Sequence, residues 1–299
     1  MQIHFLFLNN QLKLFYKMKK IFPIALVIAF VFSKNILAQS VHSCCVKPAT
    51  AEFAMLGKED GFKSAHLSPL PFNYVPHGGK IISIKTPDGK DTRAFEIKPR
   101  EPSKNFLFVF HEWWGLNDYI KQEAERLFHE LPGVTVIALD CYDGKVATTA
   151  DSASKLMQNS DVERIKNIIK GAIEYAGTEA HIQTIGWCFG GGWSLQASLL
   201  ARNQGTGCVM YYGMPEKNVN KLEKLNAPVL GLFSETDEWI TKDLVNDFEA
   251  VLRRMNKLVT IRFFKAPHAF ANPSNPKYNA EVAAEANKLA LEFLKKNLK

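Results

Sequence analysis

The residues with the clearest chemical potential form the run Gly186-Trp187-Cys188-Phe189-Gly190-Gly191. Glycines stand two positions before and two after the cysteine, as in the pattern G-x-S-x-G, which places a nucleophile on a sharp turn between a strand and a helix. The following helix directs its free N–H groups and positive dipole end at the nucleophile, which favours a thiolate and an oxyanion. We therefore predict that Cys188 is a catalytic nucleophile. The alternative is a buried structural cysteine before a glycine-rich turn.

A cysteine nucleophile needs a general base, and the base needs a third group that orients it. His268 follows the apolar run of residues 259–264 and is the only histidine after Cys188. The strand predicted at residues 229–233 is followed by three acidic residues, Glu235, Asp237 and Glu238. The position in the loop favours Asp237 as the orienting acid. An aspartate in a turn, or at the N-cap of the next helix, is the alternative for this residue.

The loop after the apolar run of residues 106–110 contributes to the same predicted site. An oxyanion hole needs two backbone N–H groups aimed at the developing charge. We expect one from Phe189, directly after the nucleophile, and the other from Glu112 or Trp113, with Trp113 preferred. The carboxylate of Glu112 stands at the end of a strand beside the site. It is interpreted as functional, with a solvated loop residue as the alternative.

Three neighbouring residues in that loop are open to ordinary structural explanations. His111 lacks a Cys, His or Asp partner at ligand spacing, so a packed or hydrogen-bonded histidine is favoured over a second base or a metal ligand. Trp113 and Trp114 suit either an aromatic pocket wall or core packing. We expect no metal and no cofactor at this site.

The N-terminal residues are typical of a targeting segment. The charged stretch Met18-Lys19-Lys20 precedes an apolar run, residues 21–32, and a candidate cleavage site follows Ala38. This is the arrangement of a signal peptide, and the apolar run is too short to span a bilayer. The alternative is a buried N-terminal helix. We expect residues 1–38 to be removed, with Met18 as the natural start, and the mature protein to be periplasmic or secreted without stable membrane insertion.

Removal of that segment changes the charge balance. The net charge of +7 includes five lysines from residues 1–38, which contain no acidic residue, so the mature chain carries +2. No basic cluster interleaved with aromatic residues is found, and we therefore expect no binding to nucleic acid.

The sequence has five cysteines, at positions 44, 45, 141, 188 and 208. An odd number in an exported chain leaves at least one free thiol or an intermolecular bond, and Cys188 is the natural free one. Cys208 lies in an apolar run and is interpreted as a small core residue. The pairing of Cys44 and Cys45 stays open, because a disulfide between adjacent cysteines is strained.

The apolar pattern predicts strands that alternate with helices. Strands are expected at 81–85, 94–97, 106–110, 134–139, 182–185, 208–212, 229–233 and 259–264, and helices at 119–130, 151–157, 162–175, 193–200, 243–255 and 279–294. Such alternation indicates an α/β fold with a mostly parallel sheet, helices on both faces and an antiparallel hairpin at the edge. One large domain is expected at residues 80–299. Residues 39–79 form a lead-in with little periodicity that we expect to lie over the surface.

Together these residues resemble the dienelactone hydrolase family of α/β-hydrolases over about residues 80–294. The resemblance rests on His111-Glu112, Gly115-Leu116-Asn117, Leu139-Asp140 with Tyr142, the run 186–191, Asp237 and Pro267-His268-Ala269-Phe270. It implies a triad of Cys188, Asp237 and His268 and an acyl-thioester intermediate. It also implies that Glu112 binds the resting thiol until substrate displaces the carboxylate, which then helps to deprotonate the thiol.

Two positions depart from the family pattern, in which two arginines hold the substrate carboxylate. The corresponding residues are Gly144, next to Lys145, and Asn272. We therefore expect neutral lactones or esters as substrates, in a pocket that contains Trp114, Tyr142, Lys145 and Asn272. The predicted function is hydrolysis of lactones or activated esters by a monomer. The alternatives are a general carboxylesterase or thioesterase for neutral acyl groups, and a non-catalytic ligand-binding protein of the cell envelope.

Overall fold

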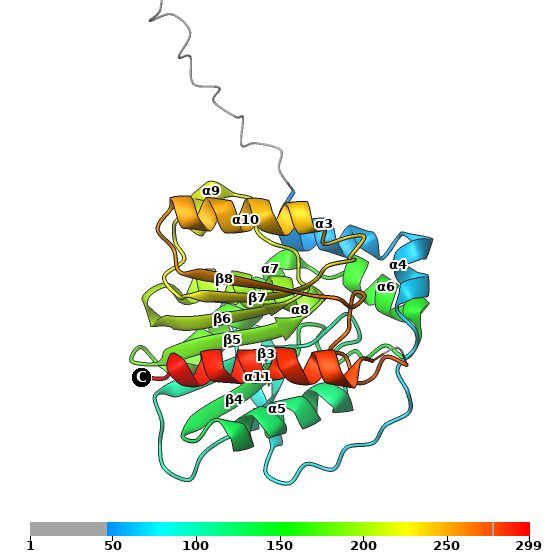
Figure 1. The fold of residues 1–299 in the computed structure, drawn as a ribbon. Coiled ribbons are helices and arrows are strands. Elements are labelled where there is room, and N and C mark those ends of the chain that lie inside the picture. The colour runs from blue at the N-terminus through cyan, green and yellow to red at the C-terminus, as the bar shows by residue number, and fades with distance from the viewer. Residues whose placement is uncertain (1–46, 277) are drawn as a thin grey trace, which may run out of the picture. The chain divides into compact units, whose positions relative to one another are not determined.

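The structure is a computed structural model that describes residues 47–276 and 278–299 (Figure 1). The predicted signal segment at residues 1–38, together with Cys44 and Cys45, lies outside the described residues. Residues 47–299 form one unit, in which the lead-in after residue 46 packs with the α/β domain.

The centre of this unit is an eight-stranded sheet in the order β1-β2-β4-β3-β5-β6-β7-β8. Both β1–β2 and β2–β4 pair antiparallel, and the remaining neighbours pair parallel. The predicted edge hairpin is therefore confirmed. The strands are β1 (Lys80–Lys85), β2 (Asp91–Ile97), β3 (Asn105–Phe110), β4 (Val134–Leu139), β5 (His181–Trp187), β6 (Gly205–Tyr211), β7 (Val229–Ser234) and β8 (Val259–Phe264).

Helices cover both faces of the sheet. Helices α5 (Asp118–Glu130) and α11 (Ala280–Lys296) lie on one face, in front of the sheet in Figure 1, and α7 (Val162–Ala176) and α8 (Phe189–Ala201) lie on the other. The remaining helices are α3 (Ala49–Leu56), α4 (Asp60–Ala65), α6 (Ala150–Gln158), α9 (Val219–Leu222) and α10 (Lys242–Arg254). No helix within the described ranges combines the length and apolar character needed to cross a bilayer.

Capping residues explain where several helices begin. Asn117, Asp161 and Asn279 accept a backbone N–H of the first turn of α5, α7 and α11, respectively. These side chains satisfy donors that have no partner inside a helix.

The lead-in is more ordered than its sequence suggested. Helix α3 packs against α8 and α6, and α4 packs against α6. Phe53 and Phe62 are buried and anchor these two helices. Helices of eight and six residues are too short to display the repeated apolar spacing by which longer helices are recognised.

The strand order creates a crevice where the chain reverses direction across the sheet. Strand β3 pairs with β4 on one side and with β5 on the other, so the connections after β3 and β5 lead to opposite faces. Loops at the carboxyl ends of such strands form the usual ligand site of open α/β sheets. The loop with Glu112 follows β3, and Cys188 follows β5.

Candidate active site

Cys188 lies on a strained turn between β5 and α8. Its backbone has φ 55° and ψ −118°, in a region that residues with side chains rarely adopt. The two glycines around it allow the turn. A Cβ atom on Gly186 would lie 2.1 Å from the carbonyl oxygen of Gly190, and one on Gly190 would lie 2.4 Å from those of Phe110 and His111. Strand β5, helix α8 and the end of β3 thus touch backbone to backbone.

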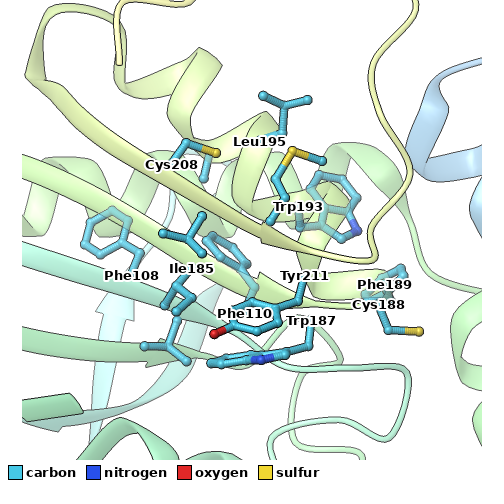
Figure 2. Close-up of a cluster of buried hydrophobic side chains, with 14 of the residues drawn as sticks. Phe108, Phe110, Ile185, Trp187, Cys188, Phe189, Trp193, Leu195, Cys208 and Tyr211 are labelled. Atoms are coloured by element: carbon cyan, nitrogen blue, oxygen red, sulfur yellow. The ribbon is translucent and has the colours of Figure 1, made fainter. Parts of the chain in front are cut away.

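Large apolar side chains support this turn. Phe110, Trp187, Phe189 and Trp193 are all buried around it. In Figure 2 the sulfur of Cys188 lies at the edge of the cluster and points away from the ring of Trp187. Close packing of this kind holds a catalytic group in one position.

His268 and Asp237 complete a chain of contacts that begins at the thiol. Nε2 of His268 lies 3.5 Å from Sγ of Cys188, and Nδ1 lies 2.6 Å from Oδ2 of Asp237. Oδ1 of Asp237 accepts the backbone N–H groups of Trp239 at 3.0 Å and Ile240 at 2.9 Å. Since Nδ1 donates to the carboxylate, Nε2 presents its lone pair to the thiol.

Only one of the three candidate acids contacts the histidine. Asp237 is buried, whereas Glu235 and Glu238 are exposed. Burial alone would raise the pKa of Asp237. The charge and hydrogen bond of His268, with the two backbone donors, lower this pKa below its usual value. The carboxylate is therefore ionised at neutral pH. By accepting the N–H groups of Trp239 and Ile240 it also stabilises the turn after β7, so the structural role considered for this aspartate is present as well.

The thiol of Cys188 rests in its protonated form. Burial raises its pKa well above the usual value, and the charges of Glu112 and Asp237 act in the same direction. The backbone N–H groups of Phe189 and Trp113 bind the sulfur and oppose this effect. The two N–H groups predicted to form an oxyanion hole therefore point at Sγ of Cys188.

Glu112 is buried and has two side-chain donors. Tyr212 donates its hydroxyl to Oε1 at 3.2 Å, and the amide of Asn272 donates to Oε2. Burial raises the pKa of Glu112 to about 7, against the opposing charge of His268. The resemblance implies a resting contact between this carboxylate and the thiol of Cys188. In this structure the carboxylate instead accepts hydrogen bonds from Tyr212 and Asn272.

A cavity of about 230 Å³ opens beside Glu112. Of the predicted pocket residues, Trp114 and Asn272 line it, together with Trp187 and Arg126. Arg126 is held by Glu123 through two hydrogen bonds, of 2.8 and 2.7 Å. The cation at this wall is therefore already paired.

Two other predicted pocket residues lie outside that lining. Tyr142 is buried, and its hydroxyl has no hydrogen-bond partner among the described residues. Burial raises the pKa of Tyr142 well above its usual value. Lys145 lies on an exposed turn that begins at Tyr142.

The remaining loop residues have packing roles. His111 is buried, its Nδ1 lies 2.5 Å from the carbonyl oxygen of Glu112, and its Nε2 accepts the N–H of Cys141 at 3.1 Å. This is the hydrogen-bonded histidine favoured by the sequence. Trp113 is fully buried, while Trp114 is both buried and part of the cavity wall. Cys208 is a buried core residue, as predicted, and burial raises its pKa to about 11.

Sequence reasoning missed His66, which the lead-in brings to the thiol of Cys188. Its Nε2 lies 4.0 Å from Sγ of Cys188, and its ring packs at 4.8 Å from Trp113 and 5.1 Å from His268. Burial and the charge of His268 lower the pKa of His66 to about 3. No spacing rule connects positions 66 and 188, so the sequence carried no signal for this contact.

The mostly parallel sheet, with a nucleophile turn after β5, an acid after β7 and a histidine after β8, defines an α/β-hydrolase. The sequence profile of the dienelactone hydrolase family matches residues 92–298. The chain belongs to the dienelactone hydrolase family. As a member of this family it is a carboxylic-ester hydrolase.

Individual relatives agree with this membership. Over 234 residues the chain is 27% identical to a provisionally named carboxymethylenebutenolidase of Aquifex aeolicus (strain VF5), covering 74% of this chain and 100% of the relative. It is 25% identical over 227 residues to carboxymethylenebutenolidase 1 of Cupriavidus pinatubonensis, and the match covers 71% of this chain and 95% of that protein. The crystal structure of a provisionally named dienelactone hydrolase from Klebsiella pneumoniae shares the fold, with a TM-score of 0.64 and 23% identity. The match covers 72% of this chain and 97% of that one.

Proposed function

We propose that this hydrolase cleaves neutral lactone or ester bonds through a thioester formed on Cys188, with His268 as the base and Asp237 as its orienting acid. The observation that carries the proposal is the unbroken chain of contacts from Sγ to Nε2 at 3.5 Å and from Nδ1 to Oδ2 at 2.6 Å. A nucleophile, a base and a group that orients the base are the parts that acyl transfer requires.

In the first half of the reaction, Sγ of Cys188 attacks the carbonyl carbon while Nε2 of His268 takes the thiol proton. Because the resting thiol has a raised pKa, its proton leaves as the sulfur–carbon bond forms. The N–H groups of Phe189 and Trp113 stabilise the oxyanion. Cleavage of the carbon–oxygen bond releases the alcohol, which takes the proton from Nε2, and a thioester remains.

In the second half, His268 takes a proton from water, which attacks the thioester carbonyl. The same N–H groups stabilise the second oxyanion, and the sulfur leaves. The acid is released as Cys188 regains its proton. The ionised carboxylate of Asp237 stabilises the imidazolium in both halves and fixes the ring tautomer.

Glu112 assists by its charge and its position. Its arrangement with Tyr212 and Asn272 keeps the carboxylate beside the thiol without occupying the place of the substrate. The ionised form would help to draw the proton from Cys188 at the start of the reaction, as the resemblance implies.

The cavity beside Glu112, which neither Cys188 nor His268 lines, favours a neutral ligand. An arginine binds a carboxylate through two charge-assisted hydrogen bonds, and neither Gly144 nor Asn272 can replace it. Among the described residues of the wall, Arg126 is already paired with Glu123. The buried carboxylate of Glu112 would also repel an anionic substrate.

We further propose that the enzyme acts outside the cytoplasm. The charged stretch at residues 18–20 and the apolar run of residues 21–32 support export. A nucleophile that rests as a buried thiol suits an oxidising compartment, because the thiolate is the form that oxidants attack.

The decisive experiment is a burst assay with an activated aryl ester. The wild type is expected to release about one equivalent of phenol rapidly as the thioester forms, and mass spectrometry of quenched protein should find the acyl group on Cys188. Cys188→Ala should abolish both signals. Cys208→Ala removes another buried thiol outside the site and should keep the burst. Normal turnover by Cys188→Ala would show that another group is the nucleophile.

A further inference from the structure

The two imidazoles that meet at Cys188 are held in the same tautomer. His66 comes from the end of α4, where its Nδ1 lies 2.6 Å from the carbonyl oxygen of Phe62. A carbonyl oxygen only accepts hydrogen bonds, so Nδ1 carries the proton and Nε2 of His66 carries a lone pair. His268 reaches the same state through its bond to Asp237.

Both lone pairs are directed at one sulfur. Nε2 of His268 lies 3.5 Å and Nε2 of His66 4.0 Å from Sγ of Cys188, and all three atoms lie within 4.8 Å of one another. A thiol has a single proton and can satisfy only one of two acceptors. The second buried nitrogen is therefore left with a lone pair and no donor from this thiol.

The two sulfur–nitrogen distances approach those of a zinc site. Zinc binds sulfur at about 2.3 Å and imidazole nitrogen at about 2.0–2.1 Å, so tetrahedral coordination separates sulfur from nitrogen by about 3.5 Å. The distance from His268 already has this value, and that from His66 exceeds it by about half an ångström. The two nitrogens, which lie within 4.8 Å of each other, would need to approach to about 3.4 Å, so zinc binding requires α4 to carry His66 toward both Cys188 and His268.

The groups that hydrogen-bond the other nitrogen of each histidine are also those found in metal sites. A histidine that binds a metal usually donates its other N–H to a carboxylate or to a backbone carbonyl, which fixes the ring. His268 has the carboxylate of Asp237, and His66 has the carbonyl of Phe62. With the thiolate, the charge of Asp237 balances a divalent cation.

We propose that Cys188, His66 and His268 form a binding site for Zn²⁺ that blocks the nucleophile. Binding exchanges the S–H bond for an S–Zn bond and releases one proton to solvent, without any change of oxidation state. Three protein ligands leave the fourth position for water. The metal is an inhibitor in this proposal, because it occupies both the nucleophile and the base. The blocking effect rests on the proposed function, whereas the metal site itself does not.

The test begins with purified, reduced protein stripped of metal by a chelator. Zinc is titrated in competition with a chromogenic chelator, and cobalt(II) serves as the spectroscopic probe. We expect one zinc per chain and a cobalt spectrum with the visible bands of tetrahedral coordination and a near-ultraviolet thiolate charge-transfer band. Removal of a group that hydrogen-bonds a metal ligand typically lowers metal affinity 10–100-fold. Removal of the ligand itself in His66→Gln should therefore lower zinc affinity at least about 100-fold.

Two variants make the result specific. His129→Gln removes an exposed histidine and should bind zinc as the wild type does. Cys188→Ser keeps the nucleophile turn and should lose the charge-transfer band, which provides a second readout if His66→Gln does not fold. Zinc affinity that is the same in wild type, His66→Gln and Cys188→Ser, or no zinc binding by the wild type, would overturn the site.

Activity measurements separate this proposal from the proposed function. Ester hydrolysis that falls in proportion to zinc occupancy supports both. Hydrolysis without zinc binding overturns the metal site alone. Zinc bound by all three residues without inhibition would keep the metal site and overturn the role of Cys188 as nucleophile.

Discussion

The side-chain amide of Asn272 donates a hydrogen bond to the carboxylate of Glu112. The position at which relatives are expected to carry a substrate-binding arginine is therefore used within the protein itself. Ser274 fixes the amide further, since its backbone N–H and its hydroxyl donate to Oδ1 of Asn272 at 2.8 and 2.6 Å. Asn272 thus holds the carboxylate in place and also lines the cavity.

This contact gives the first prediction, which concerns substrate charge. The wild type is expected to hydrolyse neutral esters with a higher kcat/KM than matched anionic esters. Asn272→Arg should move the preference toward the anion by on the order of tenfold, since one charge-assisted hydrogen bond contributes roughly 1.5–3 kcal/mol. The new cation would also meet Glu112, so the shift should be larger in the double variant with Glu112→Gln. A wild type that strongly prefers anionic esters would show that another cation serves the substrate.

The second prediction concerns the pH dependence of stability. Glu112 has a pKa of about 7 in the folded protein and an ordinary value of 4.5. The folded form therefore keeps a proton that the unfolded form releases between these values, and the free energy of unfolding falls as pH rises from about 4.5 to 7. The full loss, present above pH 7, is on the order of 3 kcal/mol.

Glu112→Gln should remove this contribution. Urea unfolding at pH 5 and pH 8 gives the measurement, and the wild type should lose more stability between the two values than the variant does. Glu235→Gln changes an exposed glutamate and should follow the wild type. Identical pH profiles for wild type and Glu112→Gln would mean that the carboxyl group titrates normally.

The third prediction concerns the orientation of the base. In Asp237→Asn the backbone N–H groups of Trp239 and Ile240 would keep the side-chain oxygen, leaving an N–H to face Nδ1 of His268. The ring would then carry its proton on Nε2 and could not accept one from Cys188. In serine enzymes this change lowers kcat roughly 10⁴-fold, and a loss of similar order is expected.

Glu238→Gln is the matched control, because it alters an exposed acid one position away. It should retain the activity of the wild type. Near-normal activity in Asp237→Asn, with a fold unchanged by circular dichroism, would show that the histidine needs no carboxylate.

The fourth prediction concerns the N-terminus of the native protein. If residues 1–38 are a signal peptide, intact-mass measurement of protein from the producing cell should find a chain that begins near Gln39 in a periplasmic or secreted fraction. Replacement of the apolar run at residues 21–32 by polar residues should keep the precursor inside the cell. A cytoplasmic protein that retains this run would contradict export.

The sequence predicted the sheet and the glycine-flanked turn at Cys188 well for physical reasons. Parallel strands buried on both faces appear as unbroken apolar runs, such as β3 and β4, and need no knowledge of their neighbours. The glycines around Cys188 are equally local, because the turn itself leaves no space for their side chains. The side-chain caps at Asp161 and Asn279, where α7 and α11 begin, are also local features.

Contacts between distant segments could not be predicted in this way. The choice of Asn272 and Tyr212 as partners of Glu112 depends on how three loops meet above the sheet. Helix α4 is too short for a periodic pattern, so neither its existence nor the contact of His66 with the thiol was foreseen. Lys145 was considered for the pocket on its position next to Gly144, but the turn points it to solvent.

The family profile begins at residue 92, whereas Phe62 and His66 precede it and pack against Trp113, Trp239 and His268. The stretch that performs the reaction and the stretch that encloses it are therefore separate in the gene. Substitutions at Phe62 and His66 would therefore change the aromatic packing around His268 and Trp113 while Cys188, Asp237 and His268 keep their identities. The side of the site that faces the lead-in can vary independently of the residues that the family profile covers.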